Sequence, residues 1–161
     1  MTAINSNRAI RGPITAVPVV AGKGVRLVAD TENNRWVVEA DETVLWENAS
    51  GDLATTALSM SESAYNFETI KVYFVDNNGN GGVQEIPMAT SPTAFTVLVS
   101  HINTAGTTSY IKNGKFALTS STITRVNEAQ VAFSGSSAST TLNATNIKLY
   151  KVIGCNRIAS A

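Results

Sequence analysis

Oxygen-bearing side chains alternate in one segment in the middle of the chain. Asp76, Asn78 and Asn80, followed by Gly81, match the start of a calcium-binding loop, in which alternate residues wrap hard oxygen ligands around one cation. A complete loop of this type has a bidentate glutamate six residues after the glycine, where this chain has Pro87. Two interpretations stay open: a Ca²⁺ site at these three residues, and a plain hairpin loop, which the incomplete motif favours.

Titratable side chains that could support catalysis are few and scattered along the sequence. His101 is the one histidine, and it ends an apolar run, where a structural or surface role is expected. No nucleophile-elbow motif accompanies it. Carboxylates pair at 30–32 and 39–42, where solvated turns are expected, and Cys155 is expected to be a small buried side chain. The sequence therefore predicts that the protein is not an enzyme.

Aromatic and amide side chains offer a different chemistry. Shallow sugar sites combine an aromatic platform with amide groups on loops, which hydrogen-bond the hydroxyls of the ligand. The candidate residues for such a site are Tyr65, Tyr110 and Asn103. Placement of the same residues in a sheet or core is the alternative.

The composition favours strands and argues against two classes of partner. Of 161 residues, 43% are apolar and only 15% charged, so Ser, Thr, Asn and Gly supply much of the polar surface. Thr and Val suit pleated sheets, whereas Asn, Gly and Ser suit turns. Twelve acidic residues balance twelve basic ones, which leaves no electrostatic footprint for nucleic acid or for an anionic membrane. No apolar run approaches the roughly 18 residues of a membrane helix.

Residues 1–42 are expected to form an N-terminal anchoring arm and a trimerisation unit. Residues 1–11 lack periodicity and predict an extended arm. Two alternating runs, 25–29 and 35–39, flank an acidic, amide-rich turn, and so short a hairpin is marginal by itself in water. We expect identical copies to cover it, with the rest of the same chain as the alternative. The predicted contact residues are Val25, Leu27, Trp36 and Val38.

Residues 43–161 are expected to form the head domain. About eight to ten short strands at roughly 8–12-residue spacing predict an antiparallel β-sandwich, jelly-roll-like. The expected strands are 43–47, 54–60, 69–75, 83–88, 95–102, 122–126, 129–134 and 145–154. Asn113–Gly114 predicts a type I′ hairpin turn. Loops are expected at 48–52 and 135–140, and Ser61 is expected to cap a turn over 61–66.

Two parts of the chain resemble structural proteins of bacteriophage particles. The G-x-G-V turn at 22–25, followed by two short strands around an Asn-containing turn, is similar to the trimeric stalk units of phage fibres. Residues 45–48, 58–61, 65–67 and 148–157 resemble a C-terminal β-sandwich of virion proteins from phages and prophages of Firmicutes. The resemblance implies a homotrimer whose N-terminal part is anchored to other virion proteins and whose C-terminal head is exposed.

Taken together, these features predict a non-enzymatic virion structural protein that needs no cofactor. It is expected to be made in the host bacterial cytoplasm and to lie on the virion surface, as a head or tail fibre or a capsid decoration protein. Host surface glycan is the candidate ligand of the head. The alternative is a stand-alone carbohydrate-binding β-sandwich module, which would be monomeric.

Overall fold

The computed structural model describes residues 25–33, 35–142 and 146–158 of the chain. The chain divides into two compact units, Met1–Glu42 and Thr43–Ala161. The arm expected at residues 1–11 lies outside the described residues. The described part is all-β with antiparallel sheets that form a sandwich, which confirms the predicted fold class.

One hairpin makes up the described part of the first unit, and its strands are β1 (Val25–Asp30) and β2 (Arg35–Ala40). Polar side chains close its turn: the Asp30 carboxylate accepts hydrogen bonds from Asn33 Nδ2 at 2.9 Å and from Arg35 Nε at 2.7 Å. The hydrogen bonds from Asn33 and Arg35 hold the pKa of Asp30 below its ordinary value. The carboxylate therefore stays ionised, and keeps both donors, well into the acidic range.

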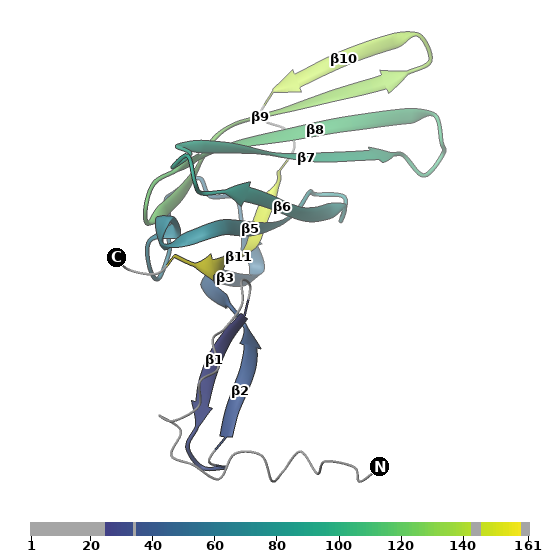
Figure 1. Ribbon diagram of the computed structural model, residues 1–161. Coiled ribbons are helices and arrows are strands. Elements are labelled where there is room, and N and C mark those ends of the chain that lie inside the picture. Colours follow the sequence, from purple (N-terminus) through teal and green to yellow (C-terminus); the bar gives the residue numbers. More distant parts are fainter. Residues whose placement is uncertain (1–24, 34, 143–145, 159–161) are drawn as a thin grey trace, which may run out of the picture. The chain divides into compact units, whose positions relative to one another are not determined.

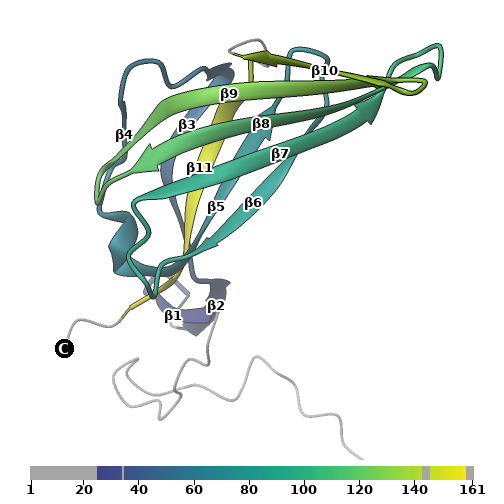
Figure 2. The same cartoon turned by 90° about the horizontal axis from the view of Figure 1, so that it is seen from above.

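Two sheets form the second unit, called the head below (Figure 1). The first sheet runs in the order β3 (Glu42–Asp52), β11 (Lys148–Arg157), β5 (Phe67–Val75) and β6 (Gly81–Pro87). The second runs in the order β10 (Ser137–Leu142), β9 (Thr122–Ser134), β8 (Thr108–Leu118) and β7 (Ala94–Ile102), and the short β4 (Leu58–Ser59) also pairs with β9. Figure 2 shows β7, β8 and β9 lying across the strands of the first sheet. Because β7 to β10 follow one another in a single sheet, this half is an antiparallel meander, whereas a jelly roll contains two Greek keys.

Apolar side chains from both sheets meet between them. Alternation along β7 buries Phe95, Val97 and Val99, and the Phe95 ring stacks on Phe116 of β8 with centroids 5.3 Å apart. From the first sheet, alternate residues of β5 and β11 reach the same core. Its other fully buried side chains include Leu45, Phe67, Ile70, Val72, Ile123, Ile147, Leu149 and Val152.

The segment from 43 to 66 departs from the sequence prediction. β3 continues through the expected loop at 48–52, and the strand expected at 54–60 is reduced to the two residues of β4. Ala54 has a left-handed backbone, with φ 53°, and its N–H donates to Asp52 Oδ1 at 2.7 Å, so the chain turns where a strand was expected. The predicted Ser61 cap is wrong by two residues, because Ser63 Oγ accepts from the N–H of Tyr65 and caps η3 (Ala64–Asn66).

The predicted hairpin at Asn113–Gly114 is wrong. Both residues lie in the middle of β8, where they pair with Leu98 and Val97 of β7. Gly114 faces the core, and a Cβ at this position would lie 3.0 Å from the Phe116 ring and 3.3 Å from Ile147 Cδ1. The glycine is therefore required by close packing, and not by the positive φ angles of a tight turn.

The predicted break at 127–128 is wrong as well, because β9 runs through it with a register shift opposite Lys115 and Phe116. Glu128 is buried at this irregularity, and its carboxylate accepts hydrogen bonds from Arg125 Nη1 at 3.0 Å and from the N–H of Ile147 at 3.2 Å. These donors satisfy a charge that would otherwise be costly to bury in the interior.

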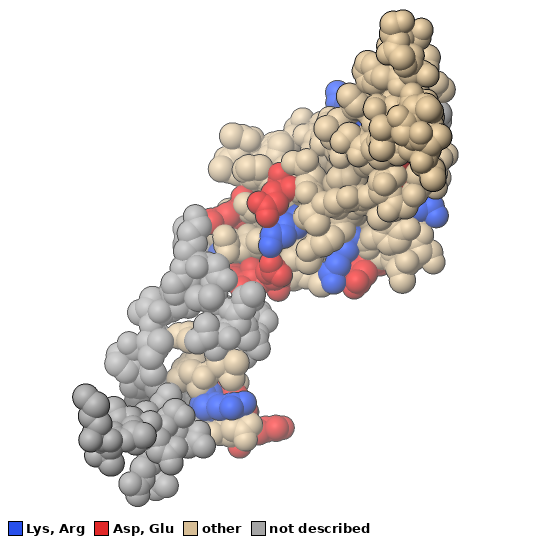
Figure 3. All heavy atoms as spheres, turned by 90° about the vertical axis from the view of Figure 1, so that its right-hand side faces the viewer, with Lys and Arg blue, Asp and Glu red and all other residues tan. Residues whose placement is uncertain are grey.

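The expected Ser/Gly loop at 135–140 contains a turn and then a strand. Gly135 adopts a positive φ of 56°, and β10 follows it with all six residues exposed. No charged residue occurs in 129–147. Accordingly, the top of the head, where Figure 1 draws the β9–β10 hairpin, shows no charged side chain in the space-filling view (Figure 3).

Close packing around Gly154 of β11 predicts that any side chain at this position will destabilise the protein. A Cβ at this position would lie 2.6 Å from the buried ring of Phe67, which Arg157 covers from 4.7 Å. Gly154→Ala should therefore lower the free energy of unfolding of the protein by about 1–3 kcal/mol, the usual range for overpacking. Urea denaturation measures the change. Gly82→Ala is the control, since its Cβ would meet Phe74 at an ordinary 3.4 Å; equal stability of the two variants would contradict the packing argument.

Candidate functional site

The candidate site begins with the loop that follows β5. The carboxylate of Asp76 closes this loop, because its Oδ1 accepts hydrogen bonds from the N–H groups of Asn78 and Asn80, each at 2.9 Å. The N–H of Asp76 in turn donates to the carbonyl of Asn80 at 2.8 Å, and Gly79 takes the positive φ that the turn requires. The loop is therefore built around one aspartate.

A lysine from the opposite sheet holds the same aspartate. Lys112 of β8 is 1% exposed, and its Nζ lies 2.7 Å from Asp76 Oδ2 and 2.8 Å from Asn77 Oδ1. Asp76 itself is buried, so water screens this ion pair little. The pair ties the loop after β5, in the first sheet, to β8 in the second.

Burial and hydrogen bonding act in opposite directions on the pKa of Asp76. Desolvation of the carboxylate raises the pKa, but the hydrogen bonds from Lys112 and from the N–H groups of Asn80 and Asn78 outweigh it. The pKa of Asp76 therefore lies below its ordinary value of 3.8. The carboxylate is ionised throughout the neutral range, as its contact with an ammonium requires.

The structure brings the three candidate calcium ligands, Asp76, Asn78 and Asn80, into one loop, but it uses them differently. The Lys112 ammonium takes the place beside Asp76 Oδ2 where a cation would sit, and backbone N–H groups occupy Oδ1. Among the described residues, no group of three or more His, Cys, Asp or Glu side chains is placed to hold a metal ion. This geometry favours the hairpin-loop interpretation of the motif.

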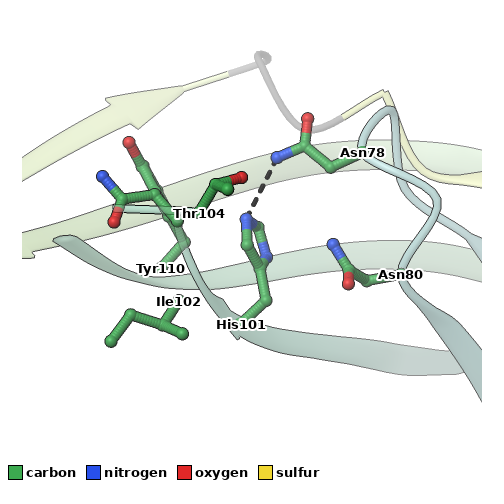
Figure 4. A pocket seen from close by; sticks show the side chains of 7 residues that line it. Asn78, Asn80, His101, Ile102, Thr104 and Tyr110 are labelled. Carbon is green, nitrogen blue, oxygen red and sulfur yellow. Dashed lines mark hydrogen bonds between the residues drawn. The ribbon is translucent and has the colours of Figure 1, made fainter. Parts of the chain in front are cut away.

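His101, near the end of β7, lies beside this loop (Figure 4). Its Nε2 is 3.0 Å from Asn78 Nδ2, and its ring stacks on Tyr110 of β8 with centroids 5.0 Å apart. The buried Nδ1 lies 3.7 Å from Asp76 Oδ2 and makes no hydrogen bond. His101 thus connects the charged pair inside the head to side chains at its surface.

An open pocket of about 420 Å³ lies outside this cluster (Figure 4). The residues that line it come from the loop after β5, the end of β7 with the turn that follows, and β8: Asn78, Asn80, His101, Ile102, Asn103, Thr104 and Tyr110. None of these side chains carries a carboxylate or an ammonium group. The pocket therefore suits an uncharged, hydroxyl-rich ligand, for which amides supply hydrogen bonds and an aromatic ring supplies a flat apolar contact.

Two of the three candidate sugar-binding residues meet in this pocket. Tyr110 contributes its ring, whereas Asn103 also has a structural role: its Oδ1 accepts from the N–H of Thr107 at 2.8 Å, within the turn between β7 and β8. Tyr65 does not line the pocket. It packs against the core and donates its hydroxyl to the carbonyl of Pro92 at 3.4 Å, which is a structural role.

Sequence reasoning missed the buried ion pair, although a signal for it was present. Asp76 follows Ile70, Val72 and Phe74 in the alternation of β5, and Lys112 is in phase with Phe116 of β8. His101 likewise continues the inward row of β7. Polar residues at core-facing positions of three strands indicate that they meet in the interior.

The predicted trimerisation residues belong to the hairpin of the first unit. Leu27 pairs with Val38, and Ala29 pairs with Trp36, so positions 25, 27, 36 and 38 fall on one face of the ladder. The side chains of Leu27 and Trp36 are half-buried. The side chains of Val25 and Val38 lie outside the described residues.

Comparison with known proteins gives no family for this chain. No protein-family model, no curated protein and no solved structure matches it. Within the described residues, no helix has both the length and the apolar character to cross a membrane.

Removing the lysine should be costly, because it leaves a buried carboxylate without its ammonium. Lys112→Met should lower the free energy of unfolding by about 3–5 kcal/mol, as measured by urea denaturation. Adding Asp76→Asn should recover part of the loss, since an amide oxygen still accepts the two backbone hydrogen bonds but carries no charge. A loss below about 1 kcal/mol in the single variant would show that the pair is hydrated and unimportant.

Proposed function

We propose that this protein is a non-enzymatic structural protein of a phage virion, and that it acts as a homotrimer. The observation that carries the proposal is the hairpin of the first unit, a sheet of two strands, β1 and β2. Lone two-stranded hairpins are marginal in water, and the Leu27 and Trp36 side chains on one face are only half-buried. Packing of this face against the same face of other copies would supply the missing burial.

The proposal gives the two units separate tasks. The N-terminal part attaches the trimer to other virion proteins, and the sandwich is displayed on the virion surface, either as a head or tail fibre or as a capsid decoration. An all-β head suits display, because apolar side chains of its own two sheets form one core. The phage assignment itself is supported by the sequence resemblance.

We further propose host surface glycan as the ligand of the displayed head. The pocket at His101 and Tyr110 supports this assignment, because its lining holds no carboxylate or ammonium group, is rich in amides and is open to solvent. The same pocket would serve a monomeric carbohydrate-binding module, which is the second candidate function. Oligomeric state separates the two functions, since only the virion protein requires association through the hairpin.

The mass of the purified chain is the first test. Mass photometry should give three times the 17.0 kDa subunit mass. Trp36→Ser should give single subunits with the head still folded, because the apolar contact at the hairpin face is lost. Val37→Ser, on the opposite face of β2, is the control and should keep the parent mass. A parent chain that is monomeric at micromolar concentration would rule out the trimer and favour the binding module.

Glycan binding is tested separately on an array of bacterial surface glycans. Tyr110→Ala should weaken binding of the recognised glycan by about tenfold, equivalent to about 1.4 kcal/mol, because it removes the aromatic contact in the pocket. Tyr73→Ala changes a tyrosine of the other sheet that does not line the pocket, and should leave binding unchanged. Equal effects of the two substitutions, or no binding across the array, would remove glycan recognition from the proposed function.

A further inference from the structure

The outward side of the second sheet carries an uncharged surface. Because Phe95, Val97 and Val99 of β7 point into the core, the residues between them face away from it. Strand register extends this outward side over β8, β9 and β10. We call the resulting set the neutral face; its twelve residues are Leu98, Ser100, Ile102, Ser109, Ile111, Asn113, Ala129, Val131, Phe133, Ala138, Thr140 and Leu142.

The neutral face exposes large apolar side chains to an unusual degree. Ile102 is 59% exposed, Leu98 57%, Phe133 42% and Leu142 69%. Single exposed apolar residues are common on protein surfaces, but a contiguous set without any charge marks an interaction surface. The face ends at the next row of the register, which holds Lys115. These features indicate that the face is covered in the working protein.

The edge strand of this face, β10, also lacks the features that usually prevent an edge strand from pairing with another chain. Within the described sheet, β10 pairs with β9 on one side and with no strand on the other, and each of its six residues is exposed. Natural edge strands are usually blocked by charged residues, proline or bulges, because an open row of N–H and C=O groups recruits other strands. The sequence of β10, Ser-Ala-Ser-Thr-Thr-Leu, contains neither proline nor a charged residue.

We propose that the neutral face packs against another copy of this chain, and so forms a contact between heads. Identical copies meet without charge repulsion where the surface is neutral, and the twelve residues contain no charged side chain. Four strands with three outward positions each cover about 400 Å². A stable interface buries about 800 Å² per partner, so the neutral face by itself supports only a weak contact.

Because the neutral face is small, the contact between heads depends on the contact between hairpins. In the proposed homotrimer, on which the inference rests, association through the hairpins would raise the effective concentration of heads near one another to about the millimolar range. A weak apolar contact is then occupied without being strong enough to aggregate separate particles. The proposed partner of the neutral face is therefore a second copy of this chain.

Chemical cross-linking tests the placement of the neutral face. Thr140→Cys puts a thiol on the face, and Thr141→Cys puts one on the opposite side of the same strand; both positions are exposed. The native Cys155 is buried, and the parent chain, treated in the same way, measures the background cross-linking through this thiol. With a short bismaleimide at micromolar protein concentration, Thr140→Cys should yield covalently joined subunits in about tenfold excess over Thr141→Cys. Denaturing gels measure the joined fraction.

A charge placed in the contact provides the second measurement. Adding Leu98→Lys to Thr140→Cys should lower the joined fraction about tenfold, because the contact would bury an unpaired ammonium. Val83→Lys, at a similarly exposed valine in the other sheet, should leave cross-linking unchanged.

Subunit mass and cross-linking together separate the inference from the proposed function. A trimeric mass with equal linking at positions 140 and 141 overturns the inference and leaves the virion function standing. A monomeric mass with linking only through Thr140→Cys at high concentration supports the neutral face and overturns trimerisation by the hairpin. Monomers without any linking overturn both.

Discussion

The contact between Lys112 and Asp76 is the interaction on which the head's surface chemistry depends. It crosses from one sheet to the other, and both side chains are buried. Burying two charges is expensive, and a buried pair is often no more stabilising than well-packed apolar residues of the same volume. What the pair adds is position, because a buried ammonium must keep both the Asp76 carboxylate and the Asn77 amide oxygen within hydrogen-bond distance.

Fixing Asp76 fixes the loop, and the loop fixes one wall of the pocket. Two backbone N–H groups bind Asp76 Oδ1, so the path of the chain through Asn78 and Asn80 follows from the place of that single carboxylate. Asn78 then meets His101, whose ring lies against Tyr110. The pocket is thus formed by polar side chains whose positions are set by charges beneath them. Such a site loses little conformational entropy when a ligand binds.

Long alternating runs made the sandwich predictable, and local turn signals misled the prediction of its details. The runs ending at Phe74 and at Val99 gave strands with the correct inward faces, because alternation is decided by burial over many residues. The hairpin turn predicted at Asn113–Gly114 was wrong, because Asn-Gly also occurs in strands. Here the glycine makes room for Phe116 and Ile147. That competition is settled by contacts from distant parts of the chain. For the candidate site, Tyr110 and Asn103 could be named from residue type, but their meeting with Asn78 depends on the ion pair between the sheets.

The hairpin of the first unit and the edge of the head share one physical problem. In the hairpin, two strands carry Leu27 and Trp36 on a single face; in the head, β10 carries Leu142 on the side that faces away from the first sheet. Within the described residues, Leu27 and Trp36 are half-buried and Leu142 is 69% exposed. In a single folded subunit the apolar side chains of both surfaces are incompletely buried, and association of several copies would bury them further. A chain with balanced charges and few of them suits such a design, because copies approach without long-range repulsion and short-range apolar contacts then decide the arrangement.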